Sequence, residues 1–171
     1  ADGDRVDGVT HTEFLAADAS VDSRHELLER MLDDLGEEGS IVVYSNFEEL
    51  RLRELAEAFP EFSERIDAVV SRLFDLCQVL RDHYYDPGFH GSYSIKKVLP
   101  VLAPDLSYEA LGEGVVKEGG AASALFARAA QGELGRDRWA ALRAELLEYC
   151  KLDTWAMVRV LGASISTMSG R

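Results

Sequence analysis

The chain has 171 residues, 47% hydrophobic and 29% charged, which is enough for one globular domain with a sizeable core. Its formal net charge of −13 argues against a protein that coats duplex nucleic acid. The charge does not exclude an enzyme that binds nucleic-acid phosphates through metal ions. No apolar run approaches the roughly 18 residues of a membrane span. Cys77 and Cys150 lie far apart without C-x-x-C spacing, so we expect a reduced, cytoplasmic protein with buried, inert thiols.

The chain begins with a polar segment, residues 1–9, which we expect to be a flexible lead-in. Residues 10–15 are a candidate strand. Residues 24–35 repeat apolar side chains at helical spacing, and Asp22 or Ser23 can cap this helix. A glycine turn then leads to a β-branched run at residues 40–44, which predicts a buried strand. This order of elements is typical of an α/β fold.

A helix predicted at residues 47–59 carries an acidic residue on its apolar stripe. Glu48 precedes Leu52, Leu55 and Phe59 on one face. The spacing alone favours a capping box, in which Glu48 bonds back to the backbone of Ser45. The alternative is a functional carboxylate, because functional groups of α/β sheets gather at the carboxyl ends of strands.

The middle of the chain contains short elements. We predict a helix at residues 62–70, a short strand at 72–74 and a helix at 76–83, for which Asp75 is more readily an N-cap than a metal ligand. The aromatic residues of the following loop, 84–93, could stack on nucleic-acid bases or pin the loop to the core.

A short helix is predicted next, from Ser94 to Leu99, ended by Pro100. Its lysine pair, Lys96 and Lys97, could hold a phosphate or be an ordinary solvated pair. Residues 102–120 look irregular. The small residues Gly119–Ser123 open a helix that reaches Gln131, and a helix start of this kind can favour an anion.

The last predicted helix, capped by Asp137 and ending near Leu161, places an acid within an apolar stripe. The stripe contains Leu142, Leu146, Tyr149, Asp153, Met157 and Val160. A carboxylate at such a position must be hydrogen-bonded, neutralised or bound to a cation. The other interpretation, which periodicity alone favours, is that the helix breaks at Leu152 and Asp153 caps a second helix. We expect residues 162–171 to be frayed.

Four sequence blocks carry a resemblance to a known family. SIVVYSNFEELRLRELAEAFPE, RLFDL, FHGSYSIKKVLP and LLEYCKLDTWAMV closely resemble a bacterial family called domain of unknown function 2779. That family resembles a divergent branch of the DEDD 3′–5′ exonucleases. The resemblance implies an α/β, helix-rich, RNase H-like fold over residues 10–161, as a single domain.

The resemblance also implies site residues. DEDD exonucleases bind two divalent metal ions, Mg²⁺ or Mn²⁺, through four acids. Tyr149 and Asp153 match the helical Y-x-x-x-D that holds the fourth acid, and Glu48 stands where the third is expected, in place of the usual Asp. Tyr149 would orient the attacking water, while Asn46, Ser94 and Lys96 would contact a single-stranded nucleic acid or short oligonucleotide. Asp75 is kept as a further candidate residue.

The chain departs from the DEDD exonucleases in one respect. Those enzymes take their first two acids from a D-x-E motif on the first strand, and no D-x-E occurs in this sequence. The resemblance implies that this motif lies upstream, so that the 171 residues hold an incomplete site with little activity and a truncated sheet. The exposed strand edge would then favour a homodimer. Two alternatives remain open: a catalytically silent interaction or regulatory module on the same fold, and a phosphate-binding protein that uses Gly119–Ser123.

Overall fold

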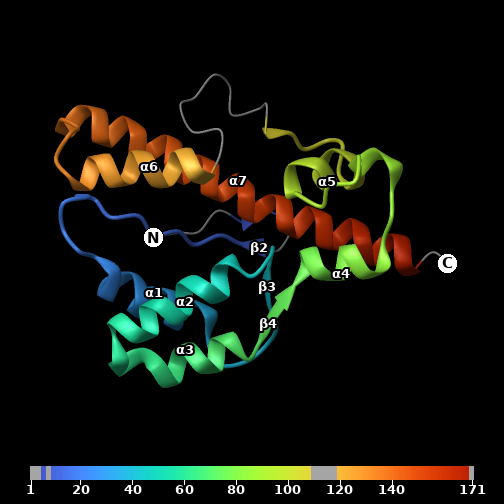
Figure 1. The fold of residues 1–171 in the computed structure, drawn as a ribbon, viewed down its shortest axis with the longest axis horizontal. Helices are drawn as coiled ribbons and strands as arrows, with labels where there is room; N and C mark the ends of the chain where they lie inside the picture. The colour runs from blue at the N-terminus through green and yellow to red at the C-terminus, as the bar shows by residue number, and fades with distance from the viewer. Residues whose placement is uncertain (1–4, 7–8, 109–118, 170–171) are drawn as a thin grey trace. The chain divides into compact units, whose positions relative to one another are not determined.

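A computed structural model describes residues 5–6, 9–108 and 119–169 (Figure 1). By their contacts, these residues divide into two compact units. Of the described residues, 5–6, 9–34 and 119–152 belong to the first unit, and 35–108 and 153–169 belong to the second. One helix, α7 (Arg136–Ser169), supplies residues to both units. The described elements form a helix-rich α/β protein with small sheets, as predicted from the order of elements.

The first unit opens with a small antiparallel hairpin. Strands β1 (Arg5–Val6) and β2 (Val9–Thr10) pair Arg5 with Thr10 and Val6 with Val9. The predicted strand at residues 10–15 is therefore wrong except at Thr10, because residues 11–16 have no regular structure. Helix α1 (Arg24–Leu35) has the predicted bounds, and its apolar face buries Leu28 and Leu32.

The other helices of the first unit are α6 (Gly119–Ala130) and the first part of α7, which lie side by side (Figure 1). Phe126 and Trp139 join them through an edge-to-face contact of 5.8 Å between ring centroids. Asp137 lies inside the first turn of α7 and is not its N-cap, since the helix begins at Arg136. A carboxylate in that turn still suits the positive end of the helix dipole.

The second unit contains a two-stranded parallel sheet of β3 (Ile41–Val43) and β4 (Leu73–Asp75). The register places Ile41 opposite Leu73 and Val43 opposite Asp75. Parallel strands need a crossover, which is built from α2 (Phe47–Ala58), a 3₁₀ turn (Pro60–Phe62) and α3 (Ser63–Val70). Both strands therefore end at one edge, from which α2 and the helix after β4 depart.

Arg72 stabilises the turn that leads into β3. Its guanidinium donates to the backbone carbonyls of Glu38 at 2.6 Å, Gly36 at 2.7 Å and Gly39 at 3.2 Å. Gly36 and Gly39 both have positive φ angles, 56° and 86°, which the turn requires. A side chain next to β4 thus fixes the backbone that precedes its partner strand.

The core of the second unit lies among α4 (Leu76–His83), α5 (Ile95–Leu102) and the second part of α7. The buried members of this cluster are Leu76, Leu80, Phe89, Val98, Leu99, Ala103, Ala156 and Val160. Phe89, in the 3₁₀ turn Pro87–Phe89, is 1% exposed and contacts the ring of Tyr93 edge-on at 5.6 Å. These contacts support the interpretation in which the aromatic residues pin the loop to the core.

Three sequence predictions about helices and thiols are wrong. Pro100 lies inside α5, which continues to Leu102, where the Ala103 N–H donates to the Leu99 carbonyl. Residues 162–169 continue α7, because Ala156, Val160 and Ser164 bury one face of it at i+4 spacing. Cys77 is buried as expected, but Cys150 is exposed.

Although α7 has 34 residues, no helix in the described part of the chain is apolar enough over sufficient length to cross a bilayer.

Candidate functional site

The turn between β3 and α2 positions Glu48 at the carboxyl edge of the sheet. Ser45 in this turn has a φ of 90°, a left-handed conformation that is uncommon for a residue other than glycine. Its N–H donates to the Asp75 carboxylate at 3.0 Å and so is not available to Glu48. The capping box is therefore not formed, and Asn46 at the N-cap position makes no side-chain capping bond either.

Glu48 is half-buried, and one of its carboxylate oxygens, Oε2, is fully enclosed without a hydrogen-bond partner. Burial raises the pKa of Glu48, its own backbone N–H opposes that effect, and the negative charges of Asp75 and Asp153 raise the pKa further. The carboxylates of Glu48, Asp75 and Asp153 therefore lie within electrostatic range of one another. We call these three residues the acidic cluster.

Asp75 ends β4 and begins α4, and it performs the predicted N-cap function. Its Oδ1 accepts a hydrogen bond from the Gln78 N–H at 3.1 Å, in addition to the one from Ser45. One carboxylate oxygen thus ties the start of α4 to the turn before α2. Asp75 acts structurally here, while its charge contributes to the potential at Glu48.

Asp153 lies in the interior of α7, so the interpretation that it caps a second helix is wrong. The stripe predicted around it is correct, since Tyr149, Val160 and other members are buried while Asp153 is half-buried. The Tyr108 hydroxyl donates to Asp153 Oδ1 at 2.5 Å, across 45 residues of sequence. The half-buried carboxylate thereby obtains a hydrogen-bond donor.

Tyr108 is the residue of this site that the sequence did not reveal. It is the single aromatic residue of the segment 102–120, which was the one available signal. The ammonium of Lys96, on α5, lies 5.4 Å from the centroid of the Tyr108 ring, within cation–π range. Lys96 is half-buried, and so differs from its exposed neighbour Lys97.

The other predicted site residues occupy varied environments. Tyr149 is buried, 5% exposed, one helical turn before Asp153 on α7. Asn46 and Ser94 are exposed and stand at the N-cap positions of α2 and α5 without side-chain capping bonds. In the structure, the charges of Asp75 and Asp153 therefore both act on Glu48, and Lys96 lies beside the tyrosine that contacts Asp153.

The acidic cluster has the chemistry of a hard-cation site. Carboxylate oxygens are the ligands that Mg²⁺ and Mn²⁺ prefer, and the enclosed Glu48 Oε2 lacks any protein donor. A cation would also relieve the mutual repulsion that raises the pKa of Glu48. Within the described ranges, however, no group of three His, Cys, Asp or Glu side chains is arranged to hold a metal ion.

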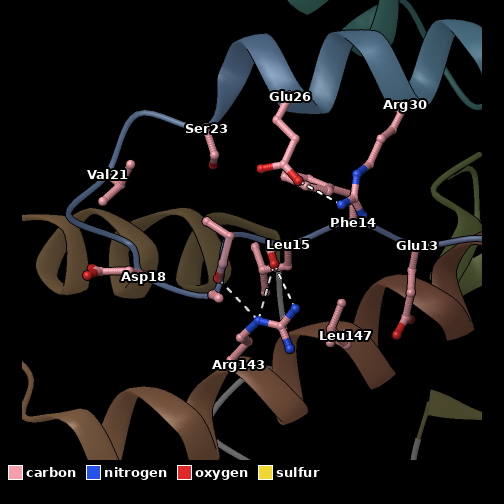
Figure 2. A pocket seen from close by; sticks show the side chains of 12 residues that line it. Glu13, Phe14, Leu15, Asp18, Val21, Ser23, Glu26, Arg30, Arg143 and Leu147 are labelled. Atoms are coloured by element: carbon pink, nitrogen blue, oxygen red, sulfur yellow. Dashed lines mark hydrogen bonds and ion pairs between the residues drawn. The ribbon is translucent and has the colours of Figure 1, made fainter. Parts of the chain in front are cut away.

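A separate cavity of about 420 Å³ lies in the first unit and contains none of the predicted site residues. Figure 2 shows Arg143 reaching from α7 to the backbone of the irregular segment before α1, where it donates to Leu15 O at 2.7 Å. On the opposite wall, Arg30 pairs with Glu26 at 2.7 Å and lies over the Phe14 ring at 5.2 Å. The two arginines therefore hold the cavity walls together.

Comparison with known proteins establishes the family. The model of the family described as domain of unknown function (DUF2779) matches residues 2–94, more than half of the chain. The chain belongs to the DUF2779 family. The matched residues contain the first two of the four sequence blocks and the start of the third. No solved structure matches the chain.

Two curated relatives of this DUF2779 chain come from mycoplasmas. The uncharacterized protein MG366 homolog of Mycoplasma pneumoniae is 32% identical over 134 residues, which cover 71% of this chain and 20% of that protein. The uncharacterized protein MG366 of Mycoplasma genitalium is 26% identical over 155 residues, 83% of this chain and 23% of that protein. The chain therefore spans between a fifth and a quarter of the length of these relatives.

Proposed function

We propose that this chain supplies part of the catalytic site of a metal-dependent 3′–5′ exonuclease of the DEDD type. The observation that carries the proposal is the environment of Glu48. A half-buried carboxylate has an unpartnered oxygen, and its pKa is raised by burial and by two acids from distant parts of the sequence. Such an arrangement lowers the free energy of unfolding unless a proton or a cation neutralises the charge, and a divalent cation suits oxygen ligands of this kind.

In this proposal, Asp153 and Glu48 are metal ligands. Asp75 fixes the turn before Glu48 through its bond to Ser45 and adds negative charge. Tyr149 orients the attacking water, and Asn46, Ser94 and Lys96 contact the nucleic-acid strand. When bound, Mg²⁺ or Mn²⁺ ions would stabilise the charge on the scissile phosphate and lower the pKa of water.

The proposal needs two further acids, because D-x-E does not occur in these 171 residues. We place those acids in another segment of a longer protein or in a partner. The relatives, four to five times longer than the matched region, leave ample sequence for such a segment. For the isolated chain the proposal therefore predicts weak metal binding and little or no nuclease activity.

The first experiment measures the metal site without requiring turnover. Mn²⁺ broadens NMR signals of nearby nuclei, so substoichiometric Mn²⁺ added to the isolated chain should selectively broaden amides near residues 45–48, 75–78 and 153. Asp153→Asn and Glu48→Gln should each reduce this effect, whereas Glu57→Gln, an exposed residue of the same helix α2, should not. Broadening spread evenly over the acidic surface would contradict the proposal.

The second experiment tests the reaction in a longer protein that includes a D-x-E segment. Release of nucleotides from a 3′ end should require Mn²⁺ or Mg²⁺ and fall by at least about a hundredfold in Asp153→Ala, since loss of a catalytic metal ligand removes several kcal/mol of transition-state stabilisation. Activity that is unchanged in this variant would remove Asp153 from the catalytic site.

A catalytically silent module on the same fold is the second candidate, and one observation favours it. Two of the three carboxylates already have protein donors, Asp75 from two backbone N–H groups and Asp153 from Tyr108. Under this alternative the acids have structural functions only. The Mn²⁺ titration separates the two candidates, because a silent module predicts no selective broadening around residues 45–48.

A further inference from the structure

Arg143 carries a positive charge that no carboxylate in the described part of the chain neutralises. It is half-buried on α7, and its donors reach only backbone carbonyls. Nε donates to Leu15 O at 3.2 Å and to Ala16 O at 3.1 Å, and Nη2 donates to Leu15 O at 2.7 Å. By contrast, Arg24 and Arg51 pair with carboxylates at 2.7 and 2.6 Å. Arg143 therefore keeps the capacity to bind an anion.

The guanidinium of Arg143 also has unused hydrogen-bond donors. A guanidinium presents five N–H groups in one plane, and within the described residues Nη1 of Arg143 donates to none of them. Arg72 offers a comparison in the same chain, because it too donates to backbone carbonyls. Both of its Nη atoms are engaged, Nη1 with Glu38 O at 2.6 Å and Nη2 with Gly36 O at 2.7 Å. In Arg143 the edge between Nη1 and Nη2 can therefore bind a carboxylate in bidentate geometry.

Arg143 lines the cavity of about 420 Å³ in the first unit (Figure 2). Leu147 lies one turn further along the same face of α7 and lines the cavity as well, together with Leu15 and Val21. The volume falls within the roughly 300–1,000 Å³ of sites that bind small molecules. A guanidinium beside apolar side chains suits an organic anion with an apolar body.

The acidic residues of the cavity wall do not provide the missing partner of Arg143. Each of them already has another partner at short distance. The pairs are Glu26 with Arg30 at 2.7 Å, Asp18 with the Ser20 hydroxyl at 2.6 Å, and Glu13 with His11 Nε2 at 3.1 Å. Among the charged residues of the wall, the unmet demand is therefore for a negative group at Arg143.

We propose that the cavity of the first unit is a binding site for a small organic carboxylate. The carboxylate group binds the edge between Nη1 and Nη2 of Arg143, and the apolar body of the ligand contacts Leu15, Val21 and Leu147. This proposal is independent of the proposed nuclease site, because none of the residues that line the cavity belongs to that site.

The first test compares two probes that share one apolar body, 3-phenylpropionate and its neutral amide, 3-phenylpropionamide. In NMR titrations of the isolated chain, the carboxylate should cause saturable shifts concentrated in the amides of residues 14–17, 23–30 and 143–147. The neutral amide should bind at least about tenfold more weakly, because hydrogen bonds to an ionised group are the stronger ones. Equal affinities, or no saturable shifts in these residues, would overturn the proposal.

The second test leaves Arg143 and its contacts with the backbone in place. Leu147→Glu introduces a carboxylate four residues after Arg143 on the same helical face, where it can pair with the guanidinium and compete with the ligand. The matched control is Leu147→Gln, which has nearly the same size without the charge. We expect 3-phenylpropionate to bind Leu147→Gln at least about tenfold more tightly than Leu147→Glu. Equal affinities for the two variants would contradict a carboxylate site at Arg143.

Discussion

At the scale of single residues, Glu48 combines partial burial with two neighbouring negative charges. A carboxyl whose folded pKa is raised holds its proton to higher pH than the unfolded chain does. The free energy of unfolding attributable to this group therefore falls as the pH rises above the ordinary glutamate value of about 4.3. The half-buried charge of Glu48 thus lowers stability at neutral pH.

Glu48→Gln should consequently raise the melting temperature at about pH 7, with the gain disappearing below about pH 4, where Glu48 is protonated in both states. Thermal unfolding followed by circular dichroism across this range would measure the difference. Glu57→Gln on the exposed face of α2 provides the baseline for loss of one charge. A destabilisation at pH 7 that disappears at low pH would instead show that the Glu48 carboxylate makes a favourable contact.

Asp75 gives a second prediction at this scale. Asp75→Ala removes the acceptor for the N–H groups of Ser45 and Gln78 and should lower the free energy of unfolding by about 1–2 kcal/mol. Asp75→Asn keeps a side-chain oxygen and removes a charge that repels Glu48, so its cost should be smaller. Urea unfolding of both variants checks the order, and equal losses would mean that the cap is not the dominant contribution.

The residues of the candidate site were predictable to different degrees. Glu48 and Asp153 could be found because each interrupts an apolar helical stripe, a pattern that the sequence displays directly. For Glu48, periodicity could not decide between a capping residue and a buried acid. That choice depends on whether the Ser45 N–H donates to Glu48 or to Asp75, which is distant in sequence. Tyr108 could not be assigned, because its partner lies 45 residues away and no repeat links them.

At the scale of elements, helices with strong patterns and clear ends were predicted best. Helices α1 and α4 have the predicted bounds, the first ending at a glycine and the second beginning at the Asp75 cap. Errors occurred where tertiary packing overrides local preference. Burial of Val98 and Leu99 keeps α5 helical through Pro100, and burial of Val160 and Ser164 extends α7 past Gly162.

The Arg72 turn provides a prediction about an element boundary. Arg72→Lys should lower the free energy of unfolding by about 1–3 kcal/mol, because one ammonium cannot replace a planar guanidinium that reaches the carbonyls of Gly36, Glu38 and Gly39. Chemical denaturation gives the magnitude. Arg65→Lys, at an exposed position on α3, is the matched control and should change stability by less than about 0.5 kcal/mol.

At the scale of the whole molecule, the net charge of −13 opposes approach of a polyanion. If the proposed function is correct, a fluorescent single-stranded oligonucleotide should not bind in about 0.1 M salt with EDTA, and Mn²⁺ should permit binding. Fluorescence anisotropy measures this. Asp153→Asn should abolish the Mn²⁺-dependent part. Binding that persists in this variant would indicate non-specific bridging between two negative molecules.

The unequal exposure of the two thiols gives the molecule a native reporter position. Burial raises the pKa of Cys77 and so suppresses its reactive thiolate, whereas Cys150 is exposed on α7. A maleimide or nitroxide reagent should therefore modify Cys150 selectively without any substitution. The labelled Cys150 is three residues from Asp153 on the same helix, about 4.5 Å along its axis. A paramagnetic ion bound near Asp153 would therefore broaden the electron spin resonance spectrum of a nitroxide on Cys150.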